Sequence, residues 1–476
     1  MSFFLILIPL AGLMVLNLPF PRLMRKAAFG FALLLFVAQA LLAALMPLEV
    51  WRRTAEPWTL LTPMPLLVDH LTIVLLVSIG LVSSAALLVG QSMLRGDNEK
   101  FNFINVLLIA FVGLNGCVLT TDLFSLYVFM EVAAVASFIL IAIQKDPNGL
   151  EGAFKYIVLS AVASALMLSS VALLLMVSGN TSYTAIAQTL HSDSARGSFA
   201  RIAVGLFLCG LFIKGGLMPF HGWVADAYSA APAPVSVFLA GVVTKVSGLY
   251  PLIRLVTAVF GFSAPVVQIL LLVGAISVVG GALAALGQRD FKRMLAYSSI
   301  SQVGYIVLGL GCGTPLGVAG AVFHLFNHSI FKSQLFVNAA AVEQRLGTRD
   351  MEKMGGLSAK MPFTSTTSVL AFLSTAGVPP LAGFWSKLVI IIALWKSAHQ
   401  TYAVVAVLAS VLTLAYFLLM QRWVFFGKLG KGLENVKEAR AGLVVPAVVL
   451  AALTVGVGLA FSFVLETFIL PAAGMR

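Results

Sequence analysis

Four lysines and one glutamate lie deep inside long apolar segments of a chain that is otherwise almost free of charge there. These residues are Glu131, Lys214, Lys245, Lys332 and Lys387. An ionised side chain at the centre of a bilayer costs at least about 2.5–3.5 kcal/mol unless it faces a protein interior or a hydrated cavity. Snorkelling to the membrane surface requires a nearby helix end, and that escape is poor for all five. We therefore expect these groups to line a polar interior.

The composition indicates a polytopic helical membrane protein rather than a soluble enzyme. Of the 476 residues, 60% are hydrophobic and only 10% are charged, and the mean hydropathy is +1.02. The cysteines Cys117, Cys209 and Cys312 are scattered singly, so neither a thiolate metal site nor a disulfide framework is expected. Most basic residues lie in short connections, where lipid topology explains the net charge of +12, and we expect no nucleic-acid partner.

The chain divides into successive apolar segments that are each long enough to span a bilayer. A spanning helix needs roughly 20 apolar residues, and about fourteen such segments predict an all-α polytopic fold. The first segment lacks the basic region and the cleavage site of a signal peptide, and we interpret it as a retained helix. The predicted spans are 3–20, 27–47, 67–91, 103–121, 122–143, 151–178, 201–228, 231–258, 264–287, 294–312, 316–341, 363–396, 402–426 and 443–470.

Basic residues are concentrated in the connections that follow odd-numbered segments. Because cytoplasmic connections hold the excess of lysine and arginine, we predict an integral protein of a bacterial or archaeal cytoplasmic membrane with both termini outside the cytoplasm. The basic side carries Arg22, Arg25, Lys26, Arg95, Lys100, Lys145, Arg289, Lys292, Arg293, Arg345, Arg349, Lys353, Lys360, Lys428, Lys431, Lys437 and Arg440. The other side carries chiefly Arg52, Arg53, Arg196, Arg201 and Lys396.

Helix breakers interrupt the seventh and the twelfth predicted segments, which are longer than a simple span. Pro219 lies in the first interruption, and Pro379 and Pro380 lie in the second. Proline removes an amide donor, so unsatisfied backbone groups arise at mid-membrane. Corresponding breaks predict two five-helix repeats, inverted because their offset of five helices is odd; ordinary transmembrane glycine and proline are the alternative. The predicted parts are 1–102 (helices 1–3), 103–260 (helices 4–8), 261–430 (helices 9–13) and 431–476 (helix 14).

Glu131 and Lys214 are candidates for a buried ion pair that controls a proton. A lone Glu131 would bind a proton, because burial in a low dielectric disfavours its anion. A lysine from another helix changes this, since a pair at ~4 Å and an effective dielectric near 20 is worth ~4 kcal/mol. Lys214 precedes the break at Pro219 by about one turn, and we interpret it as a proton carrier whose affinity depends on its partner. A static ion pair for Glu131 and snorkelling for Lys214 are the alternatives.

A second group of titratable residues lies on the eleventh segment. His324, His328 and Lys332 repeat at spacing i, i+4, i+8, which places them on one helical face and predicts a proton relay. A structural polar stripe is one alternative. A His-x₃-His metal site and a b-type haem are others, but no third metal ligand or facing histidine is evident. Lys387 follows the second break by one turn and is a candidate terminal site.

The remaining polar residues in or near the apolar segments have simpler interpretations. Lys245, in the middle of the eighth segment, has no exit to the surface, whereas Arg254 on the same segment can snorkel. His221 and Asp226 make the first break polar, and Lys155 is close enough to a helix start for snorkelling. Phosphate-binding glycine loops, dinucleotide fingerprints and nucleophile motifs are absent from the sequence, so we expect no catalytic, cofactor or metal site in this chain.

Taken together, these motifs resemble the antiporter-like membrane subunits shared by respiratory complex I, group 4 membrane-bound hydrogenases and Mrp-type cation/proton antiporters. The similarity runs from about residue 70 to residue 430. The resemblance implies that Glu131 and Lys214 form the control pair and that Lys245 is the central relay. It implies further that His324, His328 and Lys332 continue the hydrophilic axis, which ends at Lys387. The matching stretches are Glu131 in its helix, 214–254, Asp290–Ser299, His324–Lys332 and Gly377–Lys387.

The resemblance also implies a function and partners. We expect a subunit that translocates protons, with sodium as an open alternative, inside a larger membrane complex that includes a peripheral redox module. A subunit of an Mrp-type antiporter without a redox partner is the second hypothesis, and a small-molecule secondary transporter is the third. Complex I subunits usually read Leu-Pro-Asp-Ala-His where this chain has Val224–Tyr228, and one has glutamate at the position of Lys387. These departures, like residues 344–356, favour the hydrogenase and Mrp branches.

Overall fold

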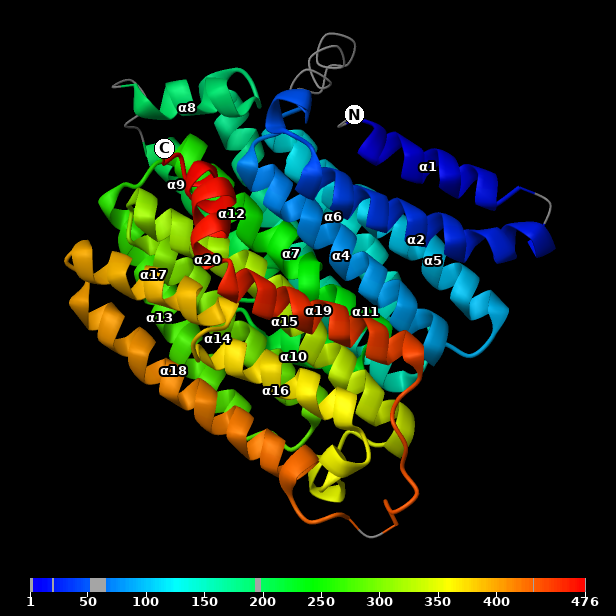
Figure 1. The fold of residues 1–476 in the computed structure, drawn as a ribbon. Coiled ribbons are helices and arrows are strands. Elements are labelled where there is room, and N and C mark those ends of the chain that lie inside the picture. The colour runs from blue at the N-terminus through cyan, green and yellow to red at the C-terminus, as the bar shows by residue number, and fades with distance from the viewer. Residues whose placement is uncertain (1–2, 19–20, 52–65, 193–197, 431, 476) are drawn as a thin grey trace.

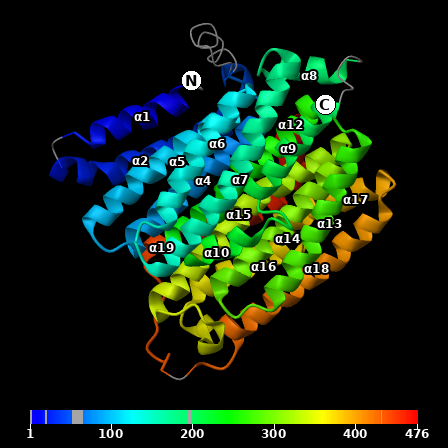
Figure 2. The same ribbon diagram turned by 180° about the vertical axis from the view of Figure 1, so that it is seen from behind.

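The protein is a bundle of closely packed helices. The computed structural model describes residues 3–18, 21–51, 66–192, 198–430 and 432–475, and these hold helices and isolated β-bridges but no β-strand. Ten helices within the described ranges are long and apolar enough to cross a membrane. Figures 1 and 2 show α1 and α2 at one edge of the bundle and α18 at the opposite edge. The predicted all-α membrane fold is therefore confirmed.

Each predicted segment coincides with a helix or with a series of shorter helices. The first part of the chain holds α1 (Phe4–Leu16), α2 (Pro21–Leu45), α4 (His70–Met93), α5 (Asp97–Leu119), α6 (Leu123–Ile141), α7 (Pro147–Ser178), α8 (Tyr183–His191), α9 (Ser198–Lys214) and α10 (Gly222–Ala230). The next segment joins α11 (Ala233–Phe238), the π-helices η2 (Leu239–Val243) and η3 (Lys245–Leu249), α12 (Tyr250–Leu255) and the π-helix η4 (Val256–Phe260).

The second part continues in the same way. It holds α13 (Ala264–Leu286), α14 (Phe291–Gly311), α15 (Pro315–Leu346), the 3₁₀ turns η5 (Met351–Lys353) and η6 (Leu357–Ala359), α16 (Pro362–Ala376), α17 (Ala382–Lys396), α18 (Gln400–Gln421) with η7 (Arg422–Phe426), α19 (Ala441–Leu459), α20 (Phe461–Val464), η8 (Leu465–Ile469) and α21 (Leu470–Ala472). The count of fourteen spans, the inverted repeats and the side on which the termini lie stay predictions. Arg52, Arg53, Arg196 and Lys431, which enter the orientation argument, lie outside the described residues.

Capping residues explain why the helices start where they do. The side chains of Asp69, Asp122, Asp146 and Asp290 each accept a hydrogen bond from an amide of the first turn that follows. An N-terminal aspartate satisfies an orphan amide and complements the positive end of the helix dipole. The chain therefore begins α4, α6, α7 and α14 at polar residues that sit at the ends of the apolar runs.

Helix α15 lies in the middle of the bundle in both views (Figures 1 and 2). It packs against α14, α16, α17 and α19, and also against α4 and α11 of the first part of the chain. Nearly all of its residues from Gly317 to Val342 are buried, although many of them are polar. Because neighbouring helices surround it, its polar side chains face protein rather than lipid.

Arg254 is buried and ion-paired, so the expectation that it can snorkel is wrong. Its side chain is 9% exposed, and its two terminal nitrogens donate to both carboxylate oxygens of Asp69, at 2.5 and 2.8 Å. Burial raises the pKa of Asp69, but the hydrogen bonds and charge of Arg254, with hydrogen bonds from Thr72, outweigh this and lower that pKa to about 2. The bidentate pair joins the start of α4 to the end of the α11–η4 segment.

We predict that Asp69→Asn lowers the free energy of unfolding of the purified protein by an amount on the order of 3 kcal/mol. The substitution leaves the buried guanidinium of Arg254 without a counter-charge. The pKa of Asp69 is lower in the folded protein than in the unfolded chain. The contribution of Asp69 to the free energy of unfolding is therefore complete above about pH 4 and is lost as the pH falls toward 2. Melting curves of both proteins in detergent at pH 7 and pH 4.5 should therefore show nearly the same difference. Asp97→Asn, at an exposed position in α5, is the control, and an equal effect there would contradict the assignment.

Candidate functional site

Glu131 of α6 and Lys214 of α9 form an ion pair across two helices. The Lys214 ammonium lies 2.9 Å from Glu131 Oε1 and donates a second hydrogen bond of 2.7 Å to Ser160 Oγ. Ser164, one turn further along α7, donates to the same Glu131 oxygen at 2.5 Å. The lysine side chain is 1% exposed and the glutamate side chain is 29% exposed. The pair thus has a buried cation and a carboxylate that reaches the outer surface of the chain.

The first helix break begins directly after Lys214, in residues 215–221 between α9 and α10. Its freed polar groups find partners elsewhere: Trp223 Nε1 donates to the carbonyl of Ile213 at 2.9 Å, and the amide of Met218 donates to Ser277 Oγ of α13 at 3.0 Å. Satisfied backbone groups allow an irregular segment to exist at membrane depth.

Two glycines bring the control pair against the helix of Lys245. A Cβ placed on Gly248 would lie 2.4 Å from Gly215 Cα and 3.0 Å from the carbonyl carbon of Lys214. The two backbones therefore touch, which only glycine allows. Lys245 precedes Gly248 by three residues, so the same contact sets the distance between the first two lysines.

Lys245 is fully buried inside a helix that is wound irregularly. It begins the π-helix η3, and Thr244 alone separates it from η2. Its ammonium donates to the carbonyl oxygen of Ala240, a group within η2. Single π-turns inside α-helices recur at functional sites because they release main-chain groups for other contacts. Lys245 has no carboxylate partner among the described residues.

The stripe predicted on α15 lies in the protein interior. Lys332 donates to Ser298 Oγ and, at 3.2 Å, to the carbonyl of Leu295, both on α14. The rings of His324 and His328 are nearly parallel, with centroids 6.3 Å apart. His324 Nδ1 shares a hydrogen bond of 2.9 Å with Ser386 Oγ of α17. Both ring nitrogens of His328 and Nε2 of His324 are buried without a hydrogen-bond partner in the structure.

Residues 377–381 form the second break, between α16 and α17. Lys387 lies in α17, shortly after this break. Its Nζ is buried without a hydrogen-bond partner and lies 4.4 Å from the centroid of the Tyr305 ring. A Cβ on Gly377 would lie 3.2 Å from Lys387 Cδ, so the lysine stem rests against the break. The ammonium is thus held by an aromatic face rather than by a counter-ion.

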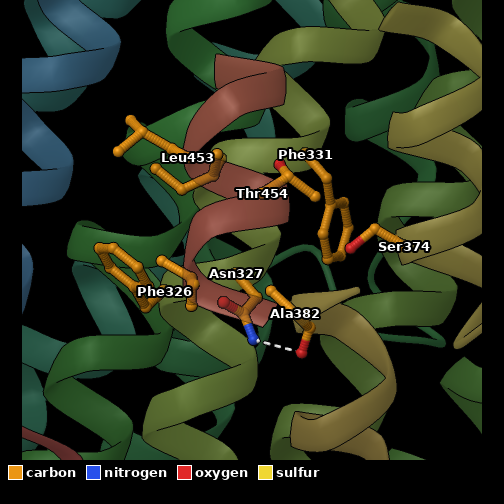
Figure 3. Close-up of a pocket in the computed structure, with 9 residues that line it drawn as sticks. Phe326, Asn327, Phe331, Ser374, Ala382, Leu453 and Thr454 are labelled. Atoms are coloured by element: carbon orange, nitrogen blue, oxygen red, sulfur yellow. Dashed lines mark hydrogen bonds between the residues drawn. The ribbon is translucent and has the colours of Figure 1, made fainter. Parts of the chain in front are cut away.

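Side chains of neighbouring helices form hydrogen bonds with main-chain groups around this second break. Asn327 of α15 donates to the carbonyl of Ala382 at 2.9 Å, as Figure 3 shows. On the same side, the amide of Gly383 donates to Ser374 Oγ at 3.0 Å. These residues line a narrow pocket that leaves essentially no room for a water molecule. The break is therefore packed on the side of Asn327.

The titratable groups lie near one another in the interior of the molecule. His328 interacts electrostatically with Lys245, Lys332 and Lys387, and it stacks on His324. Lys214 meets the helix of Lys245 through Gly248. Direct hydrogen bonds do not join the lysines to one another, and bridging water molecules are the natural links between such groups. No cluster of three or more potential metal ligands occurs among the residues that the structure describes.

The expected supporting residues lie in a polar patch and in the two helix breaks. Asp226 is bridged by Lys155 at 2.8 Å and by Arg293 at 2.7 Å, in a polar patch that joins α7, α10 and α14. His221 is half-buried, and its Nδ1 is 3.3 Å from the carbonyl of Pro219 within the first break. Pro379 and Pro380 lie in the second break, between α16 and α17.

Sequence reasoning missed the neutral partners of the charged groups. Ser160, Ser164, Ser298, Ser386 and Tyr305 hold or face the titratable side chains. The four-residue spacing of Ser160 and Ser164 on α7 was a usable signal, since it places both hydroxyls on one face. The partners of Lys332 and Lys387 lie on other helices, and nothing local in the sequence indicates them.

Comparison with known proteins places the chain in a family. Residues 120–413 match the family described as NADH:quinone oxidoreductase/Mrp antiporter, TM. The chain belongs to this family. It is 36% identical over 408 residues to the N subunit of an NADH-quinone oxidoreductase from Desulforudis audaxviator, a match that covers 84% of this chain and 80% of the relative. It is 34% identical over 396 residues to the D component of a Na(+)/H(+) antiporter from Alkalihalophilus pseudofirmus, with 83% and 80% covered.

Solved structures with this fold come from several membrane complexes. A chain of the Mrp complex from a Dietzia species superposes with a TM-score of 0.88 at 25% identity, covering 100% of this chain and 97% of that one. A chain of an archaeal membrane-bound sulfane sulfur reductase gives 0.86 at 27% identity, covering 99% and 96%. A chain of respiratory complex I from Thermus thermophilus gives 0.78 at 26%, covering 99% and 100%. This integral membrane protein is therefore an antiporter-like subunit of the kind found in such complexes.

We predict that Gly248→Ala destabilises this family member by about 1–3 kcal/mol, because the added methyl group would overlap the backbone of Gly215. The variant should melt at a lower temperature in detergent and accumulate to a lower level in membranes. Gly456→Ala is the matched control, since nothing lies within 4 Å of a Cβ at that helical position. Equal melting temperatures for the two variants would show that the contact at Gly248 is looser than described.

Proposed function

We propose that this chain translocates protons across the membrane as one subunit of a larger complex. The path is the line formed by Glu131, Lys214, Lys245, His328, Lys332, His324 and Lys387. One observation carries this proposal: four ammonium groups lie 0–3% exposed in the core of a membrane protein, and only Lys214 has a carboxylate within ion-pair distance among the described residues. Static structural charges are normally paired, because an unpaired buried ion is strongly destabilising. Exchangeable protons avoid this cost.

The Glu131–Lys214 pair is the switch in this proposal. Its attraction, on the order of 4 kcal/mol at an effective dielectric near 20, holds a proton on the lysine. When Glu131 moves away or is neutralised, Lys214 binds its proton more weakly by about a thousandfold. The proton then passes through ordered water toward Lys245 and onward to Lys387.

The position of Glu131 favours a partner subunit on the outer face of α6. Its exposed carboxylate lies on the same helical stripe as Phe124, Val128, Val135 and Ile139, each 41–51% exposed. A partly exposed carboxylate in the middle of an apolar lipid-length helix is costly against lipid. A neighbouring membrane subunit would cover it and would change the charge beside it during the working cycle.

The source of energy is a peripheral redox module in our main proposal. The relatives include subunits named NADH-quinone oxidoreductase and a chain from a sulfane sulfur reductase complex, while others are named Na(+)/H(+) antiporter subunits. An Mrp-type antiporter without electron transfer would use the same axis, with protons and sodium exchanged across the complex. In either case the chain itself supplies the ion path and no redox centre.

We predict that Lys214→Ala and Glu131→Ala each abolish proton translocation by the intact complex. Removing the amine deletes the first proton carrier, and removing the carboxylate deletes the group that controls it. The measurement is the initial rate of acidification in membrane vesicles, reported by a pH-sensitive dye after the energy source is added. Lys396→Ala, an exposed lysine at the end of α17, is the control and should retain the wild-type rate. Wild-type rates in both pair variants would remove the pair from the mechanism.

We predict that mild-detergent purification of the tagged chain recovers further membrane subunits together with iron–sulfur or nickel proteins. Mass spectrometry of the purified material identifies the partners, and metal analysis checks for iron and nickel. Recovery of small antiporter subunits without any metalloprotein would replace the redox proposal with the Mrp-type one. Recovery of the chain alone, with substrate-dependent uptake, would support the small-molecule transporter instead.

A further inference from the structure

A large polar cavity opens at the end of the bundle that carries most of the basic connections. Its volume is about 990 Å³, which is room for tens of water molecules. It lies among the ends of α4, α10 and α15 and the starts of α7, α11, α14 and α19. Figure 1 shows the connections α15–α16 and α18–α19 at this same end of the molecule. The cavity is far larger than the packed pocket at the second break.

A buried lysine, Lys292, forms part of the wall of this cavity. The residue is only 2% exposed, although it is the second residue of α14, close to the aqueous end of the helix. Its Nζ donates a hydrogen bond of 2.5 Å to the carbonyl of Ala231, at the end of α10. The charged groups that act on it are Glu343, Arg349, Asp290 and Asp146.

Glu343, near the end of α15, faces the same cavity. Its Oε2 is buried without a hydrogen-bond partner in the structure, and its Oε1 is 4.0 Å from Arg349 Nε. No direct ion pair joins Glu343 to Lys292, although each lines the cavity. A carboxylate and an amine that share a hydrated cavity without a direct contact are suited to proton exchange through water.

Helix α14 links Lys292 to the proposed axis. Leu295 and Ser298, which hold the ammonium of Lys332, follow Lys292 by three and six residues. At 1.5 Å per residue, Ser298 lies about 9 Å further along the helix. Ser299, whose hydroxyl is directed to the carbonyl of Leu295, adds a second polar group in this stretch. The cavity wall and the anchor of Lys332 are thus two turns apart on one helix.

We propose that Lys292 and Glu343 form the proton-loading site between the aqueous cavity and Lys332. Glu343 takes a proton from water and passes it to the neutral amine of Lys292. The resulting ammonium releases it to water that leads along α14 to Lys332, and both groups return to their starting state. This inference rests on the proposed function, because a loading site has meaning only for a chain that moves protons.

A structural role for Lys292 is the competing explanation. An ammonium that donates to the last carbonyls of α10 caps that helix and complements the negative end of its dipole. Arginine separates the two roles, since its guanidinium can donate to the same carbonyl but stays protonated at every accessible pH. Lys292→Arg therefore preserves a cap and removes a proton carrier.

The decisive experiment compares Lys292→Arg with Lys353→Arg in vesicles that contain the assembled complex. Lys353 is 72% exposed at the same end of the molecule and serves as the control. We expect Lys292→Arg to assemble normally and to translocate protons at least about tenfold more slowly, and Lys353→Arg to match the wild type. A wild-type rate for Lys292→Arg would overturn the loading site and leave the helix cap as its role.

Lys214→Ala in the same vesicles distinguishes this inference from the proposed function. If Lys214→Ala is inactive and Lys292→Arg is fully active, only the loading site is wrong. If both variants translocate at the wild-type rate, the proposed function fails, and the loading site fails with it.

Chemical labelling provides a measurement that does not depend on ion transport. In a Cys209→Ser background, we expect Lys292→Cys to react rapidly with a membrane-impermeant sulfonated thiol reagent that is added on the side of the cavity. Ala296→Cys, one turn deeper and fully buried, should react slowly. Equal, slow labelling at both positions would show that water does not reach Lys292. Glu343→Cys takes the place of Lys292→Cys if the latter fails to assemble, and slow labelling there would also overturn the proposal.

Discussion

The cost of holding ammonium groups in a membrane interior shapes every part of this molecule. Each of the four lysines of the proposed path meets that cost differently. Lys214 uses a carboxylate and a serine, Lys332 uses a serine and a main-chain carbonyl, Lys245 uses a carbonyl of its own helix, and Lys387 rests on an aromatic ring. Only Lys214 has a carboxylate partner among the described residues, and the other three amines meet neutral groups. In the proposed mechanism, the proton is therefore held most strongly at Lys214, as a switchable relay requires.

Irregular backbone occurs beside three of these four amines. The first break follows Lys214, the second precedes Lys387, and π-helical turns surround Lys245. Regular helices use their interior carbonyls and amides for internal hydrogen bonds, which leaves few main-chain groups for other contacts. Breaks and π-turns release such groups, and residues such as Trp223, Asn327 and Ser374 satisfy those that remain. The same irregularities that weaken the helices thus make the interior tolerant of charge.

The control group and the loading site of the proposed path lie at different places in the molecule. Glu131 reaches the outer surface of α6, where a partner subunit can act on it, while Lys292 and Glu343 face an aqueous cavity at the end of the bundle. In the proposed mechanism, the partner subunit would act at Glu131 and protons would enter from the cavity. The two effects would meet at the buried lysines. The bidentate Asp69–Arg254 pair lies apart from this path and fastens α4 to the helix that carries Lys245. Such a fixed support would let the relay change charge without moving its scaffold.

The sequence by itself determined the membrane class, the positions of the helices, the two breaks and the identity of the buried charges, because long apolar runs, prolines and isolated lysines are local signals. It also predicted that Glu131 and Lys214 would pair. Only the tertiary structure decided that Arg254 turns inward to Asp69, that Gly248 touches Gly215, and that Lys387 rests on Tyr305. Each of these contacts joins residues far apart in the chain, and its geometry depends on how whole helices pack. Packing is a collective property, and no local pattern of residues encodes it.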